Sequence, residues 1–401
     1  MIRSLNILFA WELGQGLGHV WRHLELATLL RVRGHVISFA ANDLKQAATA
    51  LAGSGFNVVQ TPVRQKRVSP DPVICSHGDV LAYHGMADPA VCDSLLEAWA
   101  QCFKDERIDL VIIDHAPGAL FAAKCLGIKT LELATGFGLP PPLTPFPSFR
   151  PWEGLTTADL LLRELRCLAA MNPFALSHGR PTFPNLAQAL AADVALLATF
   201  AELDHYPQRA QGRYIGPTES YQRGESVPWP GHAKHRVFVY LHHLRESAAL
   251  LSQLNELEID VIAYCPDVTA SERQFLAAPH LNMVERPVHL ASVLDHCDLA
   301  ITNGGHGVVS ACVLQGVPVL AIPQHIEQRL MVDCLRRCGL GEGLMQANLA
   351  SDLQPSVDRL LGDASYKDAG ARLKQKYRTY SLPQTLQRLA NTVEGLVNAP
   401  Q

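Results

Sequence analysis

Short apolar runs alternate with amphipathic stretches along this chain, a pattern typical of βαβ units around a parallel sheet. Apolar residues at helical spacing across 19–33 predict a helix, and Gly34 follows it where a helix C-cap glycine is common. In the first half, the runs that predict strands are Asn6 to Trp11, Val36 to Ala41, Asn57 to Gln60, Leu110 to Ile113, Thr130 to Leu133 and Val194 to Ala198. This half therefore predicts one doubly wound α/β domain.

A second series of the same kind follows, and its predicted strands are Val237 to Leu241, Val261 to Tyr264, Leu299 to Ile301 and Val319 to Ile322. The segment before it is rich in Pro, Gly, Gln and Arg and has no periodicity, which is typical of a linker. The chain after residue 363 is amphipathic and helical. We therefore predict domains at 1–218 and 236–362, an interdomain linker at 219–235, and helices at 363–401 that cross back toward the first domain.

The composition limits the classes of function. A chain of 401 residues with 48% hydrophobic residues is long enough for two cores. Its formal net charge of -4 gives no basic surface for nucleic acid, so we expect no nucleic-acid partner. The ten cysteines include no Cys-x-x-Cys pair, which favours reduced thiols in the cytoplasm and no bound metal.

No apolar run is long enough to cross a membrane. The first one, Asn6 to Trp11, is only six residues long, whereas a spanning helix needs about 18 apolar residues. We expect a cytoplasmic protein that makes at most a peripheral contact with a membrane.

The first predicted strand is followed by Glu12-Leu-Gly-Gln-Gly-Leu-Gly-His19. A dinucleotide-binding fingerprint requires a glycine at the position of His19, so the pattern argues against NAD. A histidine at a helix start suits a general base, because the positive helix end disfavours the imidazolium and keeps the ring neutral. The alternative is a histidine that only caps the helix or packs on the loop.

Asp114 comes directly after an apolar predicted strand, at the sheet edge where α/β sites assemble. Its carboxylate there can hold the imidazole of His19 in the tautomer that accepts a proton. It can equally cap the next helix, and the sequence leaves both interpretations open.

A third motif, Asn303-Gly304-Gly305-His306-Gly307, joins a predicted strand to a predicted helix. Free N–H groups at such a helix start can hold a diphosphate without a metal. The chain contains no Asp-x-Asp pair of the kind that holds a metal-bound donor. The alternative is a tight turn whose glycines serve only packing.

Together these residues resemble the inverting GT-B glycosyltransferases, a family that includes macrolide, flavonoid and glucuronosyl transferases. The resemblance is densest from Gly18-His19 to Gly34-His35 and from Ala300 to Gly343. It implies two Rossmann-like, doubly wound domains that face a central cleft, the first binding the acceptor and the second the nucleotide sugar. The donor is a co-substrate, and no cofactor is implied.

The resemblance also implies roles for single residues. His19 matches the base and Asp114 its acidic partner. The other matched or neighbouring positions are expected to bind the donor: Asn303, Gly304, Gly305, His306 and Gly307 at its diphosphate, Glu327 and Gln328 at its sugar, and His242 and His289 nearby. Asn303 and Ala311 depart from the family, which usually has a histidine and a ribose-binding glutamate there. The nucleotide therefore stays open between UDP and dTDP.

The stretch Leu139 to Pro151 contains six prolines, and we expect it to form a loop along the acceptor site. Apolar side chains in this region, Phe137 and Trp152 among them, favour a small apolar acceptor. We therefore expect a metal-independent transfer of a hexosyl group, with inversion, to an acceptor hydroxyl. The alternatives are a catalytically silent GT-B protein that binds a nucleotide or a partner, and a nucleotide-sugar epimerase.

Overall fold

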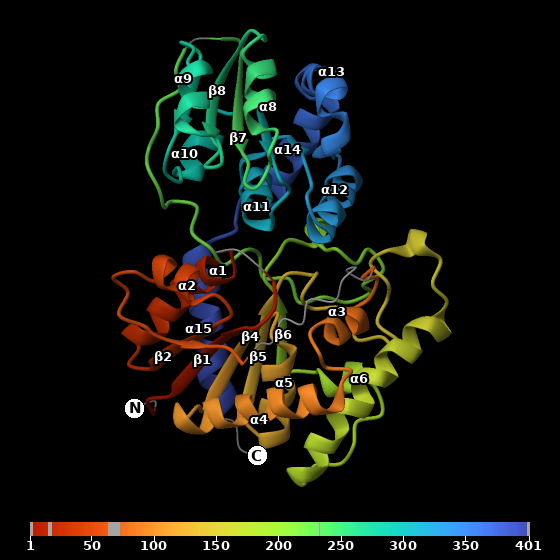
Figure 1. The fold of residues 1–401 in the computed structure, drawn as a ribbon. Coiled ribbons are helices and arrows are strands. Elements are labelled where there is room, and N and C mark those ends of the chain that lie inside the picture. Colours follow the sequence, from red (N-terminus) through yellow and green to blue (C-terminus); the bar gives the residue numbers. More distant parts are fainter. Residues whose placement is uncertain (1–2, 15–17, 63–72, 232, 399–401) are drawn as a thin grey trace. The chain divides into compact units, whose positions relative to one another are not determined.

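The computed structural model describes residues 3–14, 18–62, 73–231 and 233–398, which form two compact units (Figure 1). Unit 1 contains the described parts of Met1–Thr199, Tyr206–Glu219 and Leu382–Gln401. Unit 2 contains Phe200–His205 and the described parts of Ser220–Ser381. Each unit is a layered α/β structure built on its own sheet.

In the described part of unit 1, six parallel strands form a sheet in the order β3-β2-β1-β4-β5-β6. The strands are β1 (Asn6–Trp11), β2 (Val36–Ala41), β3 (Asn57–Gln60), β4 (Leu110–Asp114), β5 (Lys129–Ala134) and β6 (Val194–Leu197). The helices are α1 (Gly18–Val32), α2 (Leu44–Ala50), α3 (His77–Tyr83), α4 (Pro89–Asp105), α5 (Pro117–Leu126), α6 (Thr157–Ser177), α7 (Leu186–Ala189), α15 (Leu382–Asn398) and the 3₁₀ helix η1 (Pro151–Glu153).

Both faces of this sheet are buried, because successive side chains of a strand point to opposite sides. In β1, Ile7 and Phe9 pack with residues of α1, α2 and α15. Leu8 and Ala10 pack with residues of α4, α5 and α6 on the other face. Gly34 ends α1 with a φ of +93°, as its predicted C-cap role requires.

In the described part of unit 2, six parallel strands form a sheet in the order β12-β11-β10-β7-β8-β9. The strands are β7 (His235–Tyr240), β8 (Ile259–Tyr264), β9 (Leu281–Val284), β10 (Leu299–Thr302), β11 (Val319–Ala321) and β12 (Gly341–Gly343). The helices are α8 (Ser247–Leu254), α9 (Ala270–Phe275), α10 (Leu290–Leu294), α11 (His306–Gln315), α12 (Ile326–Cys338), α13 (Leu349–Gly362), α14 (Ala364–Lys376) and the 3₁₀ helices η2 (Ala201–Leu203) and η3 (Gln346–Asn348).

The two sheets have the same strand order when each is counted from its own first strand, 3-2-1-4-5-6, which is the Rossmann order. The predicted fold class, two Rossmann-like doubly wound domains, is therefore confirmed. In each sheet the order reverses beside the first strand, at β1 and β4 in unit 1 and at β7 and β10 in unit 2. Ligands of such sheets bind in the crevice at the carboxyl ends of these strands.

Some elements differ from the sequence prediction. Strands β9 and β12 were not predicted, because Asn282 interrupts the apolar run of β9 and β12 reads Gly-Glu-Gly, with no apolar pattern. From Ser220 on, the segment predicted as a linker belongs to unit 2, where the N–H of Glu225 donates to Pro287 O. The C-terminal segment divides, since α14 packs against α11 in unit 2 and α15 against α1 in unit 1.

Among the described residues, no helix is long and apolar enough to cross a membrane.

Candidate active site

The switch point of unit 1 brings the ends of β1 and β4 together. The two strands are parallel neighbours, and their last residues, Trp11 and Asp114, lie opposite each other. The chain leaves β1 through Glu12–Gly14 and enters α1 at Gly18. His19 therefore stands at the start of a helix that begins beside the last residue of β4. Residues 15–17 of the predicted glycine motif lie outside the described residues.

His19 and Asp114 are hydrogen bonded. The Nδ1–H of His19 donates to Asp114 Oδ2 across 3.0 Å. The imidazole also stacks on the indole ring of Trp11, with 5.2 Å between the ring centroids and 15° between the planes. The His19 side chain is 16% exposed. The hydrogen bond at Nδ1 thus holds the imidazole ring in place. The other ring nitrogen, Nε2, faces Gly14, and a Cβ added to Gly14 would lie only 2.9 Å from it.

Two further side chains of α1 bind the same carboxylate. Arg22 Nη1 donates to both Asp114 oxygens, at 3.0 and 3.2 Å, and His23 Nε2 donates to Oδ2 at 3.0 Å. Because residues three and four apart lie on one helix face, α1 presents His19, Arg22 and His23 together. Arg22 and His23 were not predicted as site residues, although their spacing from His19 was a signal for them.

The electrostatics of this cluster keep Asp114 ionised. Burial alone would raise the pKa of Asp114, but the charge of Arg22 and the bond from His19 hold that pKa well below its usual range. His23 is fully enclosed, and burial lowers the pKa of its imidazole despite the bond to Asp114. In this cluster Asp114 is therefore ionised, whereas His23 is neutral.

The alternative role of Asp114, capping the next helix, belongs instead to Glu12. Helix α5 begins at Pro117, and the N–H groups of Gly118 and Ala119 donate to Glu12 Oε2 at 2.8 and 3.2 Å. Burial raises the pKa of Glu12 to about 7, against the lowering effect of these two bonds. Asp114 instead binds side chains of α1.

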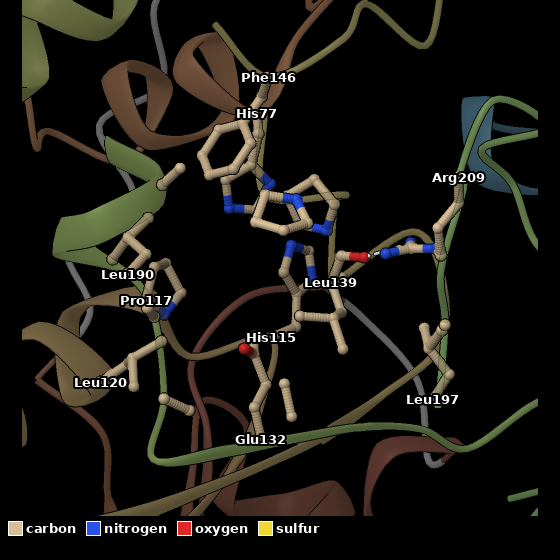
Figure 2. A pocket seen from close by; sticks show the side chains of 18 of the residues that line it. His77, His115, Pro117, Leu120, Glu132, Leu139, Phe146, Leu190, Leu197 and Arg209 are labelled. Carbon is tan, nitrogen blue, oxygen red and sulfur yellow. Dashed lines mark hydrogen bonds between the residues drawn. The ribbon is translucent and has the colours of Figure 1, made fainter. Parts of the chain in front are cut away.

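A cavity of about 620 Å³ lies within unit 1, next to this cluster (Figure 2). His115 connects the two, because its ring lines the cavity and lies 6.3 Å from the ring of His19. Most of the lining is apolar and includes Leu120, Leu139, Phe146, Leu190 and Leu197. The predicted loop Leu139 to Pro151 contributes Leu139, Pro140, Pro142 and Phe146 to this wall.

The backbone of His115 is strained in a way that places its side chain. Its φ is +50°, in the left-handed region that residues other than glycine rarely adopt. Its carbonyl oxygen accepts a hydrogen bond from the N–H of Leu13. Strained residues of this kind cluster at functional sites. His115 is therefore a functional candidate that the sequence pattern did not show.

Further polar side chains line the cavity, among them His77, Arg209 and Glu132 (Figure 2). Burial lowers the pKa of His77 to about 4, so its imidazole is neutral. Arg209 donates to the carbonyl oxygen of Leu139 at 2.6 Å. Glu132 is a buried acid on β5, and it too was not predicted. The signal for it was an acidic residue between Leu131 and Leu133 in an apolar strand.

The two predicted acceptor contacts lie in different surroundings. Phe137 packs edge-on against His115, with 6.0 Å between the ring centroids, and so stands beside the cavity. Trp152 lies in η1, is 54% exposed and is not part of the cavity lining. Both assignments stay predictions.

The predicted diphosphate turn lies at the switch point of unit 2. Gly304 has a φ of +82°, and Gly305 is the N-cap of α11 and provides no side-chain cap. A Cβ added at Gly305 would have no neighbour within 4 Å, so the helix start is sterically open there. His306 is buried, and its Nε2 lies 3.3 Å from Ser310 Oγ. Gly307 is half-buried in the first turn of the helix.

Asn303 and Gln328 hold the loops around this turn. Asn303 Oδ1 accepts from the N–H of His242 at 2.8 Å, and Gln328 Oε1 accepts from the N–H of Gln324 at 2.8 Å. Gln324 Nε2 in turn donates to His242 O at 2.6 Å. The ends of β7, β10 and β11 are thus tied together by amide side chains.

Glu327 lies in the first turn of α12, near the buried His205. His289 is the N-cap of α10, and its Nδ1 accepts from the N–H of Ser292 at 3.1 Å. The donor roles of Glu327 and His289 stay predictions. Within the described ranges, no group of three or more His, Cys, Asp or Glu side chains is arranged to hold a metal ion.

Residues 248–392 match the family described as "Erythromycin biosynthesis protein CIII-like, C-terminal domain". Together with the fold and with the relatives below, this match indicates a glycosyltransferase. The chain is similar in sequence and in fold to the GT-B glycosyltransferases of the macrolide type.

This glycosyltransferase is similar to the PGL/p-HBAD biosynthesis glycosyltransferase of Mycobacterium tuberculosis, with 24% identity over 292 residues, 67% of each chain. Its fold matches the glycosyltransferase SnogD from Streptomyces nogalater with a TM-score of 0.64 and 19% identity, covering 98% of this chain and 100% of SnogD. It also matches the spinosyn rhamnosyltransferase SpnG, complexed with thymidine diphosphate, with a TM-score of 0.67 and 16% identity over 96% and 99% of the chains. A further SpnG structure holds spinosyn aglycone.

Proposed function

We propose that this glycosyltransferase moves a sugar from a UDP- or dTDP-sugar to a hydroxyl of a small apolar acceptor, with inversion and without a metal ion. The observation that carries the proposal is the hydrogen bond between His19 Nδ1 and Asp114 Oδ2, next to a largely apolar cavity. The tautomer that this bond requires leaves His19 Nε2 unprotonated and able to accept a proton.

The reaction is a single displacement. His19 Nε2 takes the proton of the acceptor hydroxyl, whose oxygen forms a bond to the anomeric carbon on the face opposite the leaving group. The bond between that carbon and the diphosphate oxygen breaks, and the diphosphate leaves with the electron pair. The imidazolium that forms is stabilised by the ionised Asp114, while Arg22 keeps that carboxylate charged. General bases of this kind typically contribute about two to four orders of magnitude in rate.

The start of α11 is the proposed site for the diphosphate. Its N-cap residue, Gly305, has no side chain to cap the helix and leaves space for an anion to approach the first N–H groups. The positive end of the helix dipole adds to this attraction, so no metal ion is required. The SpnG complex with thymidine diphosphate supports a donor of the same class.

The unit 1 cavity is the proposed acceptor site. Its volume of about 620 Å³ suits a small molecule, and its walls are mostly apolar. Support also comes from the SpnG structure with spinosyn aglycone. His115 lies between this cavity and His19, so a hydroxyl at that end of the acceptor would be close to the base.

The test is a transfer assay with UDP- and dTDP-sugars and a panel of aryl alcohols. We expect His19→Ala to lower kcat by about two to four orders of magnitude without changing the Kd of dTDP. His296→Ala, which removes an exposed histidine, is the control and should keep the wild-type rate.

Two further readouts test the stereochemistry and the metal. Proton NMR of the first product formed should show the anomeric configuration opposite to that of the donor. The rate should be the same in EDTA. An unchanged rate in His19→Ala, or a retained configuration, would contradict the proposal.

A further inference from the structure

Glu132 occupies a position in β5 where a core residue is expected. Its neighbours Leu131 and Leu133 point to the other face of the sheet and pack in the core beneath α1 and α15. Glu132 points the opposite way and lines the unit 1 cavity, as does Ala195, its partner on β6 (Figure 2). The strand thus places an acidic side chain in the wall of a largely apolar cavity.

The carboxyl group of Glu132 has no partner in the described part of the chain, where neither a hydrogen bond nor an ion pair involves it. The residue is only 6% exposed. The side chain faces the cavity, where a ligand oxygen can supply the partner that the described side chains do not, and polar groups left without a partner are rare in folded proteins.

The surroundings of Glu132 decide which form of the carboxyl is present. Burial, assisted by the charge of Asp114, raises the pKa of Glu132 to about 8, although Arg209 acts in the opposite direction. Arg209 does not form an ion pair with it. The other titratable groups of the cavity wall are His77, His115 and Arg213. At neutral pH Glu132 is therefore largely a neutral acid, with an O–H to donate.

We propose that Glu132 determines acceptor specificity by donating a hydrogen bond to an uncharged oxygen, a carbonyl or a hydroxyl, on an otherwise apolar acceptor. This inference rests on the proposed function and names the chemistry of its acceptor. The acceptor then carries two oxygen groups: the hydroxyl that receives the sugar, near His19, and a second oxygen that reaches β5.

A cationic acceptor is disfavoured by the same wall. An ammonium group would require the ionised carboxylate, whose formation in this cavity is opposed by burial. Arg209 and Arg213 also place two positive charges on the lining. An uncharged oxygen satisfies the acid without adding charge to a largely apolar space.

Binding of two matched probes to the full chain tests the proposal. The probes are 2-naphthol and 6-acetyl-2-naphthol, which differ by one carbonyl-bearing group, and their Kd values are measured by calorimetry at neutral pH without any donor. We expect the acetyl probe to bind about tenfold more tightly to the wild type, as a well-placed hydrogen bond implies. Glu132→Gln, which keeps an N–H donor, should preserve this preference, and Glu132→Leu should abolish it.

Glu97→Leu is the control, because it makes the same substitution at an exposed glutamate of α4 outside the cavity lining and should leave the preference intact. The proposal is wrong if the wild type binds neither probe or both equally, or if Glu132→Leu keeps the preference. Tighter binding of 6-(aminomethyl)-2-naphthol than of the acetyl probe would also overturn it. Since no sugar is transferred in this assay, a failure of the proposed transferase activity is seen separately.

Discussion

His19 and Asp114 are 95 positions apart in the chain, yet Nδ1 of one lies 3.0 Å from Oδ2 of the other. The pairing follows from the parallel register of β1 and β4, which places Asp114 opposite Trp11 at the same end of the sheet. Helix α1 then adds Arg22 and His23 to the same carboxylate. A single aspartate thereby orients the proposed base and balances a buried guanidinium.

Asp114→Asn should impair both stability and catalysis. It removes the carboxylate that pairs with Arg22, whose side chain is 8% exposed, and breaking a buried pair in this way costs about 3–5 kcal/mol. The amide group also introduces an N–H donor that can face His19 Nδ1 and favour the other tautomer, so kcat should fall by about two to four orders of magnitude. Urea unfolding and steady-state kinetics measure the two effects.

Arg22→Gln separates these effects, because it removes the guanidinium and keeps the bond between His19 and Asp114. It should lower the free energy of unfolding and reduce kcat much less than Asp114→Asn does. Equal losses of kcat in the two variants would show that the orientation of His19 by Asp114 is unimportant.

Gly14→Ala should displace the ring of His19. A Cβ at this position would lie 2.9 Å from His19 Nε2, closer than real contacts allow, and the φ of Gly14 is +90°. We expect kcat to fall by about tenfold or more, since small misplacements of a reacting group are costly. Gly53→Ala has a similar backbone strain, with a φ of +74°, and no neighbour within 4 Å. This control should lose stability alone, and the prediction fails if the two variants keep the same kcat.

His77 should make the protein less stable in mild acid. Burial lowers its pKa to about 4 in the folded state, while the unfolded chain binds the proton near the ordinary value of 6.5. Its contribution to stability is therefore full above about pH 6.5 and is lost as the pH falls toward 4, by roughly 3 kcal/mol.

The free energy of unfolding of His77→Gln, measured with urea across this range, should change less steeply with pH than that of the wild type. The difference in slope should correspond to about one proton taken up on unfolding. His84 and His205, whose pKa values burial also lowers to about 4, should keep the remaining slope in the variant. Substitution of the exposed His243 by Gln should leave the slope unchanged. A slope in His77→Gln that equals that of the wild type would contradict the assignment.

Gly305→Leu should weaken nucleotide binding without unfolding unit 2. The position is open and has an ordinary φ of -66°, so a larger side chain fits there but covers the first N–H groups of α11. We expect the Kd of dTDP to rise by about tenfold or more, with a loss of stability of about 1 kcal/mol or less. Gly362→Leu, also at an open position, is the control. Calorimetry that gives equal Kd values for both variants would remove α11 from the donor site.

Much of the fold was predictable because it depends on local patterns. The runs Asn6–Trp11, Val36–Ala41 and Asn57–Gln60 were predicted to the residue, since an apolar strand between turn residues has clear ends. Strand β12, Gly341–Gly343, was not predictable in this way. It has no apolar pattern and is held by its pairing with β11.

The sequence by itself determined the fold class, the family resemblance, and the candidates His19, at the start of α1, and Asp114, at the end of β4. These follow from periodicity and from the rule that parallel strands end at one edge. Only the tertiary structure decided that Glu12, rather than Asp114, binds the start of α5, and that Glu132 points into a cavity. Such outcomes depend on which side chains meet across segments far apart in the chain, and no local pattern carries that information.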